Sequence, residues 1–113
     1  MKVHLHHVGL AVGDIEATVA AFRAAFGAER MPEPAAGHVL VRVGDVHLAL
    51  VPRHDGDPRA RARGDHLAFT LSASEHTHVV HQLLANGWRS QDVQGRTYVQ
   101  NDDRSLTLEL LVE

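Results

Sequence analysis

The fold is decided by residues 7–15, which read HVGLAVGDI in one-letter code. Val8, Leu10 and Val12 alternate with small or polar residues, and this is the period of a strand with one buried face. Asp14 follows at a position typical of a helix N-cap. The segment therefore predicts a strand that leads directly into a helix.

The predicted helix carries an apolar stripe. Ile15, Val19, Phe22 and Phe26 follow one another at spacings of four, three and four residues, which places them on one face. Gly27 is a natural C-cap. Three strands are then expected, over 28–33, 39–43 and 46–51. The first half of the chain thus has the order β–α–β–β–β.

The second half repeats this order. A strand is predicted over 65–71, and Ser72 with Glu75 has the spacing of a capping box at the start of a helix that ends at Gly87. Three further strands are expected, over 88–93, 96–101 and 105–112. His7 and His66 are 59 positions apart, and residues 46–51 resemble 106–111 at an offset of 60, which indicates an internal repeat.

The length of 113 residues fits a single domain over 1–113. We divide it into module 1 (1–51), a linker (52–64) rich in Pro, Gly, Asp and Arg, and module 2 (65–113). The predicted class is α+β, with two βαβββ modules that form a curved mixed sheet around a cleft.

Composition limits the classes of partner. The formal charge is −3 and no basic patch dominates, so nucleic acid is not expected. No apolar stretch approaches the ~20 residues that a membrane span needs. The chain has no cysteine, which excludes disulfides and thiolate metal sites and fits a reducing cytosol. A cytoplasmic protein is the expectation.

One face of each predicted sheet carries small or polar residues and faces away from the helix. On these faces lie His7, His66 and Glu109, which supply two imidazoles and one carboxylate. Such a set holds a divalent metal (Mn, Fe(II), Zn, Ni or Co) and leaves coordination positions open. The alternatives are a strand histidine satisfied by a neighbour, and an ion pair between Glu109 and an arginine of another strand.

These segments resemble the vicinal oxygen chelate superfamily, which includes glyoxalases, bleomycin-resistance proteins and extradiol dioxygenases. Residues 7–15, 65–69 and 106–110 resemble its opening strand, the start of its second module and its closing strand. The resemblance implies a curved eight-stranded sheet around a metal bound by His7, His66 and Glu109. Glyoxalase I and methylmalonyl-CoA epimerase also use a ligand from the fourth strand, where this chain has Ala49.

Other polar residues are candidates for the same cleft. His47 is a candidate catalytic base, a fourth ligand or a pocket wall. Arg42 either binds an anionic substrate or lies in solvent at a strand edge. Tyr98 either faces the cleft or is a buried structural residue. Thr70 is placed in the substrate pocket, and Glu109 is the other candidate catalytic group.

The favoured function is a metal-dependent enzyme acting on a small oxygen-rich molecule that chelates the metal, as isomerase, lyase, ring-cleaving dioxygenase or thiol transferase. A non-catalytic protein that binds a small molecule or antibiotic is the alternative, and a structural or regulatory module is a third. The resemblance also implies a homodimer, with His7 from one subunit and His66 and Glu109 from the other; pairing of the modules within one chain stays open.

Overall fold

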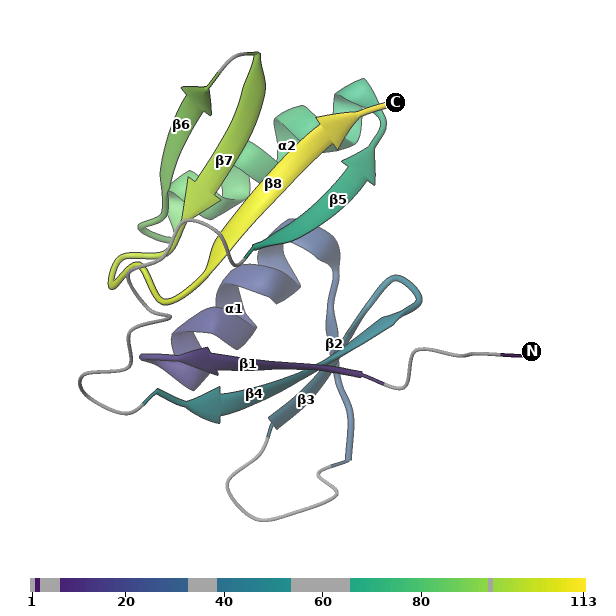
Figure 1. Ribbon diagram of the computed structural model, residues 1–113, viewed down its shortest axis with the longest axis vertical. Helices are drawn as coiled ribbons and strands as arrows, with labels where there is room; N and C mark the ends of the chain where they lie inside the picture. Colours follow the sequence, from purple (N-terminus) through teal and green to yellow (C-terminus); the bar gives the residue numbers. More distant parts are fainter. Residues whose placement is uncertain (1, 3–6, 33–38, 54–65, 94) are drawn as a thin grey trace.

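The computed structural model describes residues 2, 7–32, 39–53, 66–93 and 95–113. Within these residues the chain forms a β–α–β–β–β module twice (Figure 1). The first module contains β1 (Val8–Val12), α1 (Ile15–Phe26), β2 (Glu29–Arg30), β3 (Val39–Val43) and β4 (Val46–Pro52). The second contains β5 (Leu67–Leu71), α2 (Ala73–Ala85), β6 (Arg89–Val93), β7 (Arg96–Gln100) and β8 (Thr107–Val112).

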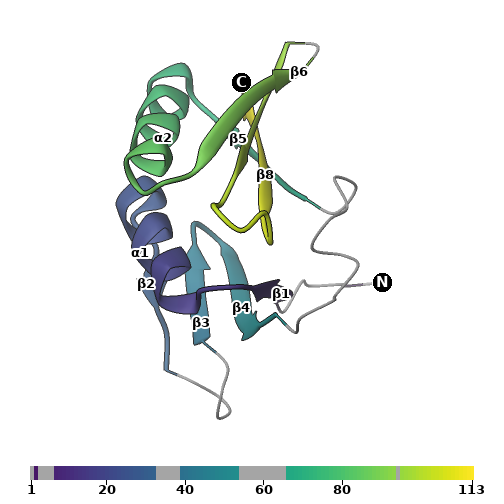
Figure 2. The ribbon, with the colours of Figure 1, turned by 90° about the vertical axis from the view of Figure 1, so that its left-hand side faces the viewer.

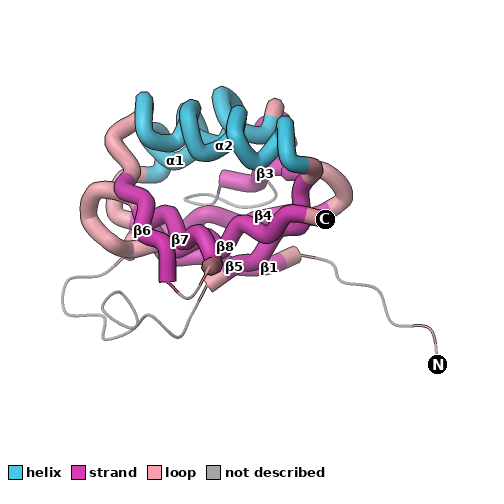
Figure 3. Tube along the Cα trace, turned by 90° about the horizontal axis from the view of Figure 1, so that it is seen from above, coloured by secondary structure: helices cyan, strands magenta, loops and turns pink. Residues whose placement is uncertain are grey.

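The described strands form two four-stranded mixed sheets with the same topology. Their orders are β1-β4-β3-β2 and β5-β8-β7-β6, and the pairs β1–β4 and β5–β8 are parallel while the other pairs are antiparallel. Both helices lie on the same side of the molecule and leave the opposite face of each sheet without a helix (Figures 2 and 3). The expected α+β class with two βαβββ modules is confirmed.

The strand registers show how closely the modules match. Ala49 lies between Gly9 on β1 and Leu40 on β3. In the second module, Glu109 lies between Ala68 on β5 and Tyr98 on β7. Ala49 and Glu109 therefore occupy equivalent places, as their 60-residue offset predicts, and the carboxylate is present in one module only.

The core lies between the helices and the sheets. Alternate residues of the inner strands are completely buried there: Leu48, Leu50, Val41, Leu108 and Val99. Helix α1 packs against α2. The Phe22 ring of α1 lies 6.0 Å from the ring of Trp88, just before β6, so one apolar cluster joins the two modules. This packing confirms the assignment of the apolar strand faces to the helix side.

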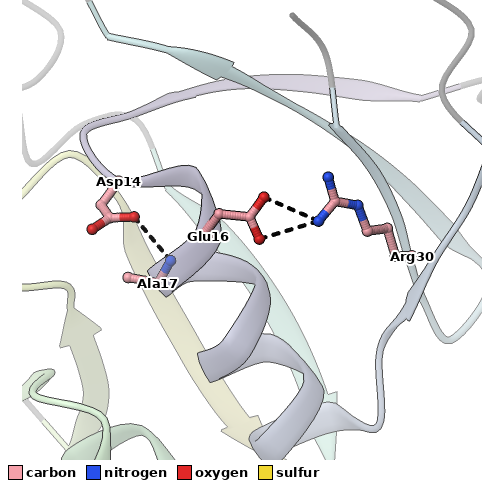
Figure 4. A network of polar contacts seen from close by, with 4 residues as sticks. All are labelled: Asp14, Glu16, Ala17 and Arg30. Carbon is pink, nitrogen blue, oxygen red and sulfur yellow. Dashed lines mark hydrogen bonds and ion pairs between the residues drawn. The ribbon is translucent and has the colours of Figure 1, made fainter.

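The first helix begins and ends as its sequence predicts. The Asp14 carboxylate accepts a hydrogen bond of 2.9 Å from the Ala17 backbone N–H (Figure 4). Gly27 caps the C-terminus in the left-handed conformation, with φ 65°, which glycine adopts without steric cost. Arg30 Nη1 lies 3.0 and 3.1 Å from the two Glu16 carboxylate oxygens, which ties β2 to the first turn of α1.

Some predicted boundaries differ from those observed. Helix α2 ends at Ala85 with Asn86 as its C-cap, so Gly87 (φ 88°) stands one residue beyond the cap rather than in it. Within residues 28–32, the described part of the strand predicted over 28–33, β2 covers only Glu29–Arg30. Residues 3–6, just before the predicted first strand, and most of the predicted linker lie outside the described residues.

A polar contact also joins the modules, at the end of β1. The backbone N–H of Gly13 donates to Ser105 Oγ at 3.2 Å, and the Asp103 carboxylate occupies the place where a Cβ on residue 13 would lie. Arg53 donates to the Asp103 backbone carbonyl at 3.3 Å. The turn before β8 is therefore held against the first module. In the described part of the chain, neither helix is long and apolar enough to span a bilayer.

The capping box of α2 is formed and gives a stability prediction. Ser72 Oγ accepts from the Glu75 backbone N–H at 3.2 Å, and the Glu75 carboxylate accepts from the Ser72 backbone N–H at 2.9 Å. Ser72→Ala is expected to lower the free energy of unfolding by about 1 kcal/mol, measured by urea denaturation. Ser74→Ala, at an exposed position in the same turn, should change it by less than about 0.5 kcal/mol. Equal effects of the two variants would contradict this assignment of the cap.

The same cap depends on pH. The hydrogen bond from the Ser72 backbone N–H, together with the Ser72 hydroxyl, holds the pKa of Glu75 below its usual range. A lowered pKa in the folded state stabilises the fold above the unfolded-state pKa. This stabilisation is lost as the pH falls through the folded-state pKa, so the effect of Ser72→Ala should shrink in acid.

Candidate metal centre

Glu109 is the buried charged residue of the helix-free face of the second sheet. It lies on the inner strand β8 with 4% of its surface exposed, although the face itself is not covered by a helix. Its Oε1 lies 3.1 Å from His66 Nε2, and its Oε2 lies 3.2 Å from Arg96 Nη1. A carboxylate that is removed from water needs such partners, because an unpaired buried charge is costly.

His66 and Tyr98 complete the surroundings of this carboxylate. His66 directly precedes β5, and its side chain is 30% exposed, so one ring edge contacts Glu109 while part of the ring reaches solvent. The Tyr98 ring packs edge-on against the imidazole at a centroid distance of 5.8 Å. Tyr98 is half-buried and directly opposite Glu109 in the β7–β8 register, so it belongs to the same face.

The geometry of the pair fits two neighbouring ligands of one ion. Two ligands that are each about 2.1 Å from a metal, at a right angle to one another, stand about 3 Å apart. The distance between His66 Nε2 and Glu109 Oε1, 3.1 Å, agrees with this separation, and it is also an ordinary hydrogen-bond length. An imidazole nitrogen and a carboxylate oxygen suit Mn, Fe(II), Zn, Ni and Co.

The third predicted ligand is not brought to this pair within one chain. His7 directly precedes β1 in the first module, where its place in the repeat matches that of His66 before β5. Among residues 7–32, 39–53, 66–93 and 95–113, no three His, Asp or Glu side chains are grouped so that they could hold a metal. The single chain thus presents two of the three proposed ligands together.

The remaining candidates lie on the expected faces. Arg42 is directly opposite His47 in the β3–β4 register. The Arg42 guanidinium forms a 2.9 Å ion pair with Glu29 and is 44% exposed, and its role in binding a substrate stays a prediction. Thr70 is exposed on β5 and opposite Leu111. His47 is half-buried on β4, in the first module, and so belongs with His7 rather than with Glu109.

Arg96 is the site residue that sequence reasoning did not name. The ion pair of Glu109 with an arginine of another strand was expected only as an alternative, and Arg96 is that arginine. Its place is given by alternation, because it lies two residues before Tyr98 and therefore on the same face of β7. Knowing that Tyr98 pairs with Glu109 would have identified it, but the sequence alone does not give the register between β7 and β8.

Comparison with known proteins identifies the family. Residues 4–101 match the family model of the Glyoxalase/Bleomycin resistance protein/Dioxygenase superfamily. The chain therefore belongs to this superfamily, the vicinal oxygen chelate proteins. No curated protein gives a significant match over the chain.

Solved structures of fosfomycin resistance proteins have the same fold. The FosX protein from Mesorhizobium loti aligns with a TM-score of 0.77 at 18% identity, covering 97% of this chain and 92% of that one. FosX from Listeria monocytogenes aligns with a TM-score of 0.79 at 20% identity, covering 100% and 93%. A mutant of the latter, complexed with Mn(II) and 1S,2S-dihydroxypropylphosphonic acid, aligns with a TM-score of 0.77 at 20% identity, covering 98% and 90%. At these identities the likeness shows the fold.

Proposed function

We propose that this protein is a divalent-metal-dependent enzyme that acts on a small oxygen-rich molecule able to chelate the metal. The observation that carries the proposal is the contact between His66 and the buried Glu109 on a helix-free sheet face, with His7 at the matching place of the other module. Superfamily membership supports it, and so does the Mn(II) found in a FosX structure of this fold.

His7, His66 and Glu109 are the proposed metal ligands. A divalent ion held there would polarise the substrate oxygens and stabilise an enolate, an alkoxide or another oxyanion. The half-buried Tyr98 beside His66 would donate a hydrogen bond to the substrate and exclude water from one side of the site. His47 is the proposed base for reactions that need a proton transfer, and Thr70 a wall of the pocket.

A homodimer would bring the third ligand to the other two. Within one chain His7 does not join His66 and Glu109 among the described residues, and α1 packs on α2 in a way that holds the two modules together. We propose that His7 of a second subunit supplies the missing imidazole. Two-fold symmetry would then create two equal sites in each dimer.

Turnover that depends on metal tests the proposal. The protein, loaded in turn with Mn(II), Fe(II), Zn(II), Ni(II) and Co(II), is incubated with epoxides, hemithioacetals and catechols, with and without a chelator. The expected result is consumption of one substrate class that stops with the chelator and in His66→Ala. Tight binding of a compound without turnover, unaffected by the chelator, would contradict it.

One observation favours the alternative of a non-catalytic binding protein. Arg96 and His66 already satisfy both oxygens of Glu109, so the carboxylate does not need a metal to remain buried. In such a protein, Arg96→Gln would lower stability and no variant of the three proposed ligands would change any metal-dependent property.

A further inference from the structure

The helix-free face of the second sheet carries charged side chains of both signs. Strand alternation and register place three ionised side chains on it: Arg89, Arg96 and Glu109. Arg89 is opposite Gln100, whose amide donates to Thr107 Oγ1 at 2.8 Å across the same face.

Arg96 is placed to contact both Glu109 and a ligand. Its contact with Glu109 uses one guanidinium nitrogen, Nη1, while the guanidinium has five N–H donors in a planar fork. The Arg96 side chain is 62% exposed, whereas the carboxylate it contacts is almost completely buried. Donors of Arg96 therefore face the space above the sheet at the edge of the proposed metal centre.

The charges determine which ligand this centre would attract. Arg96 and Glu109 cancel in formal charge, and neutral histidines add none. With Arg96 present, the +2 charge of a bound divalent ion would remain for a ligand to balance. Without Arg96, the Glu109 carboxylate would neutralise half of that charge. A positively charged and partly buried centre favours an anion over a neutral molecule.

We propose that Arg96 binds an anionic oxygen group of the substrate, so that the protein acts on a phosphonate, phosphate or carboxylate rather than on a neutral diol or ketone. The inference rests on the proposed function. Arg96 pairs with Glu109 in the metal-free protein. Once Glu109 binds the metal, the remaining N–H donors of Arg96 hold the substrate anion in a charge-assisted hydrogen bond.

The test uses the full-length protein with Mn(II) and inorganic phosphate as probes. Isothermal titration calorimetry gives the Mn(II) affinity first, and then the phosphate affinity of the Mn(II)-loaded protein. Arg96→Gln is expected to weaken phosphate binding at least about ten-fold, since a hydrogen bond to a charged group is lost. Arg96→Lys should retain part of the affinity, because it keeps the charge but loses the planar fork.

The same variants separate a ligand-binding role from a structural one. Arg96→Gln should leave the Mn(II) affinity unchanged or raise it, because Arg96 competes with the ion for Glu109. Arg30→Gln is the matched control: it also removes an arginine from an ion pair with a glutamate, but on the helix side of β2, and should change neither affinity.

Four results would overturn the inference, and they distinguish its failure from that of the proposed function. Phosphate affinity that is the same in Arg96→Gln and the wild type, or no phosphate binding by the Mn(II)-loaded wild type, overturns the role of Arg96 alone. A ten-fold loss of Mn(II) affinity in Arg96→Gln assigns Arg96 to the support of Glu109 instead. Failure of the wild type to bind Mn(II) or any other divalent ion overturns the proposed function itself, and the inference with it.

Discussion

Glu109→Gln is expected to weaken divalent-metal binding by at least about a hundred-fold, with a parallel loss of metal-dependent activity. Changes to groups that only orient a metal ligand already cost about 10–100-fold, and this change removes the anionic ligand itself. The glutamine keeps the shape of the side chain and an oxygen that can accept from His66 or Arg96. Stability of the metal-free protein should therefore fall by only about 1 kcal/mol, because Arg96 is mostly solvated.

Metal affinity is measured by titrating the protein with Mn(II) and recording the fraction bound. Stability is measured separately by thermal unfolding of the metal-free protein. Glu16→Gln is the control, because Glu16 also pairs with an arginine but lies on the exposed surface of α1. It should leave metal affinity unchanged. If Glu109→Gln bound Mn(II) as tightly as the wild type, Glu109 would be a purely structural partner of Arg96.

Mixing two inactive variants is expected to restore metal sites. His7→Ala and Glu109→Gln each remove a ligand from every site of their own homodimer. In a mixed dimer, one site carries both changes and the other has three intact ligands, if His7 comes from the opposite subunit. With random exchange of subunits, about a quarter of the wild-type number of sites should return. The readout is Mn(II) bound per chain after the variants are co-expressed.

A second mixture provides the control. His66→Ala and Glu109→Gln change ligands of the same half-site, so each site of the mixed dimer keeps one defect and none should be restored. Equal failure of both mixtures would place all three ligands in one chain, and a His7→Ala homodimer that binds Mn(II) like the wild type would remove His7 from the ligand set. Recovery of Mn(II) binding in both mixtures would mean that the three substitutions do not act on one shared metal site.

The positions of the strands and helices follow from short-range patterns in the sequence. Val8, Leu10 and Val12 predict β1 because their alternation matches the pleat, and Asp14 and Ser72 predict the helix starts because their side chains satisfy backbone N–H groups there. The place of Glu109 on the helix-free face follows from the same alternation, since Leu108 and Leu110 face the core.

Contacts between segments that are distant in the sequence are harder to predict from sequence patterns. The contact of Arg96 with Glu109 depends on the register of β7 with β8, which side-chain periodicity within one strand does not give. The contact of Gly13 with the turn at Asp103 depends on how the modules sit together. The relation of His7 to His66 is a question of assembly, and one chain's sequence pattern does not answer it.

The proposed function requires that His66 and Glu109 bind a metal ion. The metal content per chain tests this requirement, measured by elemental mass spectrometry on tag-free wild-type protein and on His66→Ala after dialysis against divalent ions. We predict close to one Mn, Fe, Zn, Ni or Co per chain in the wild type and a large loss in the variant. A wild-type protein that is metal-free and remains so after exposure to these ions would contradict the proposed function.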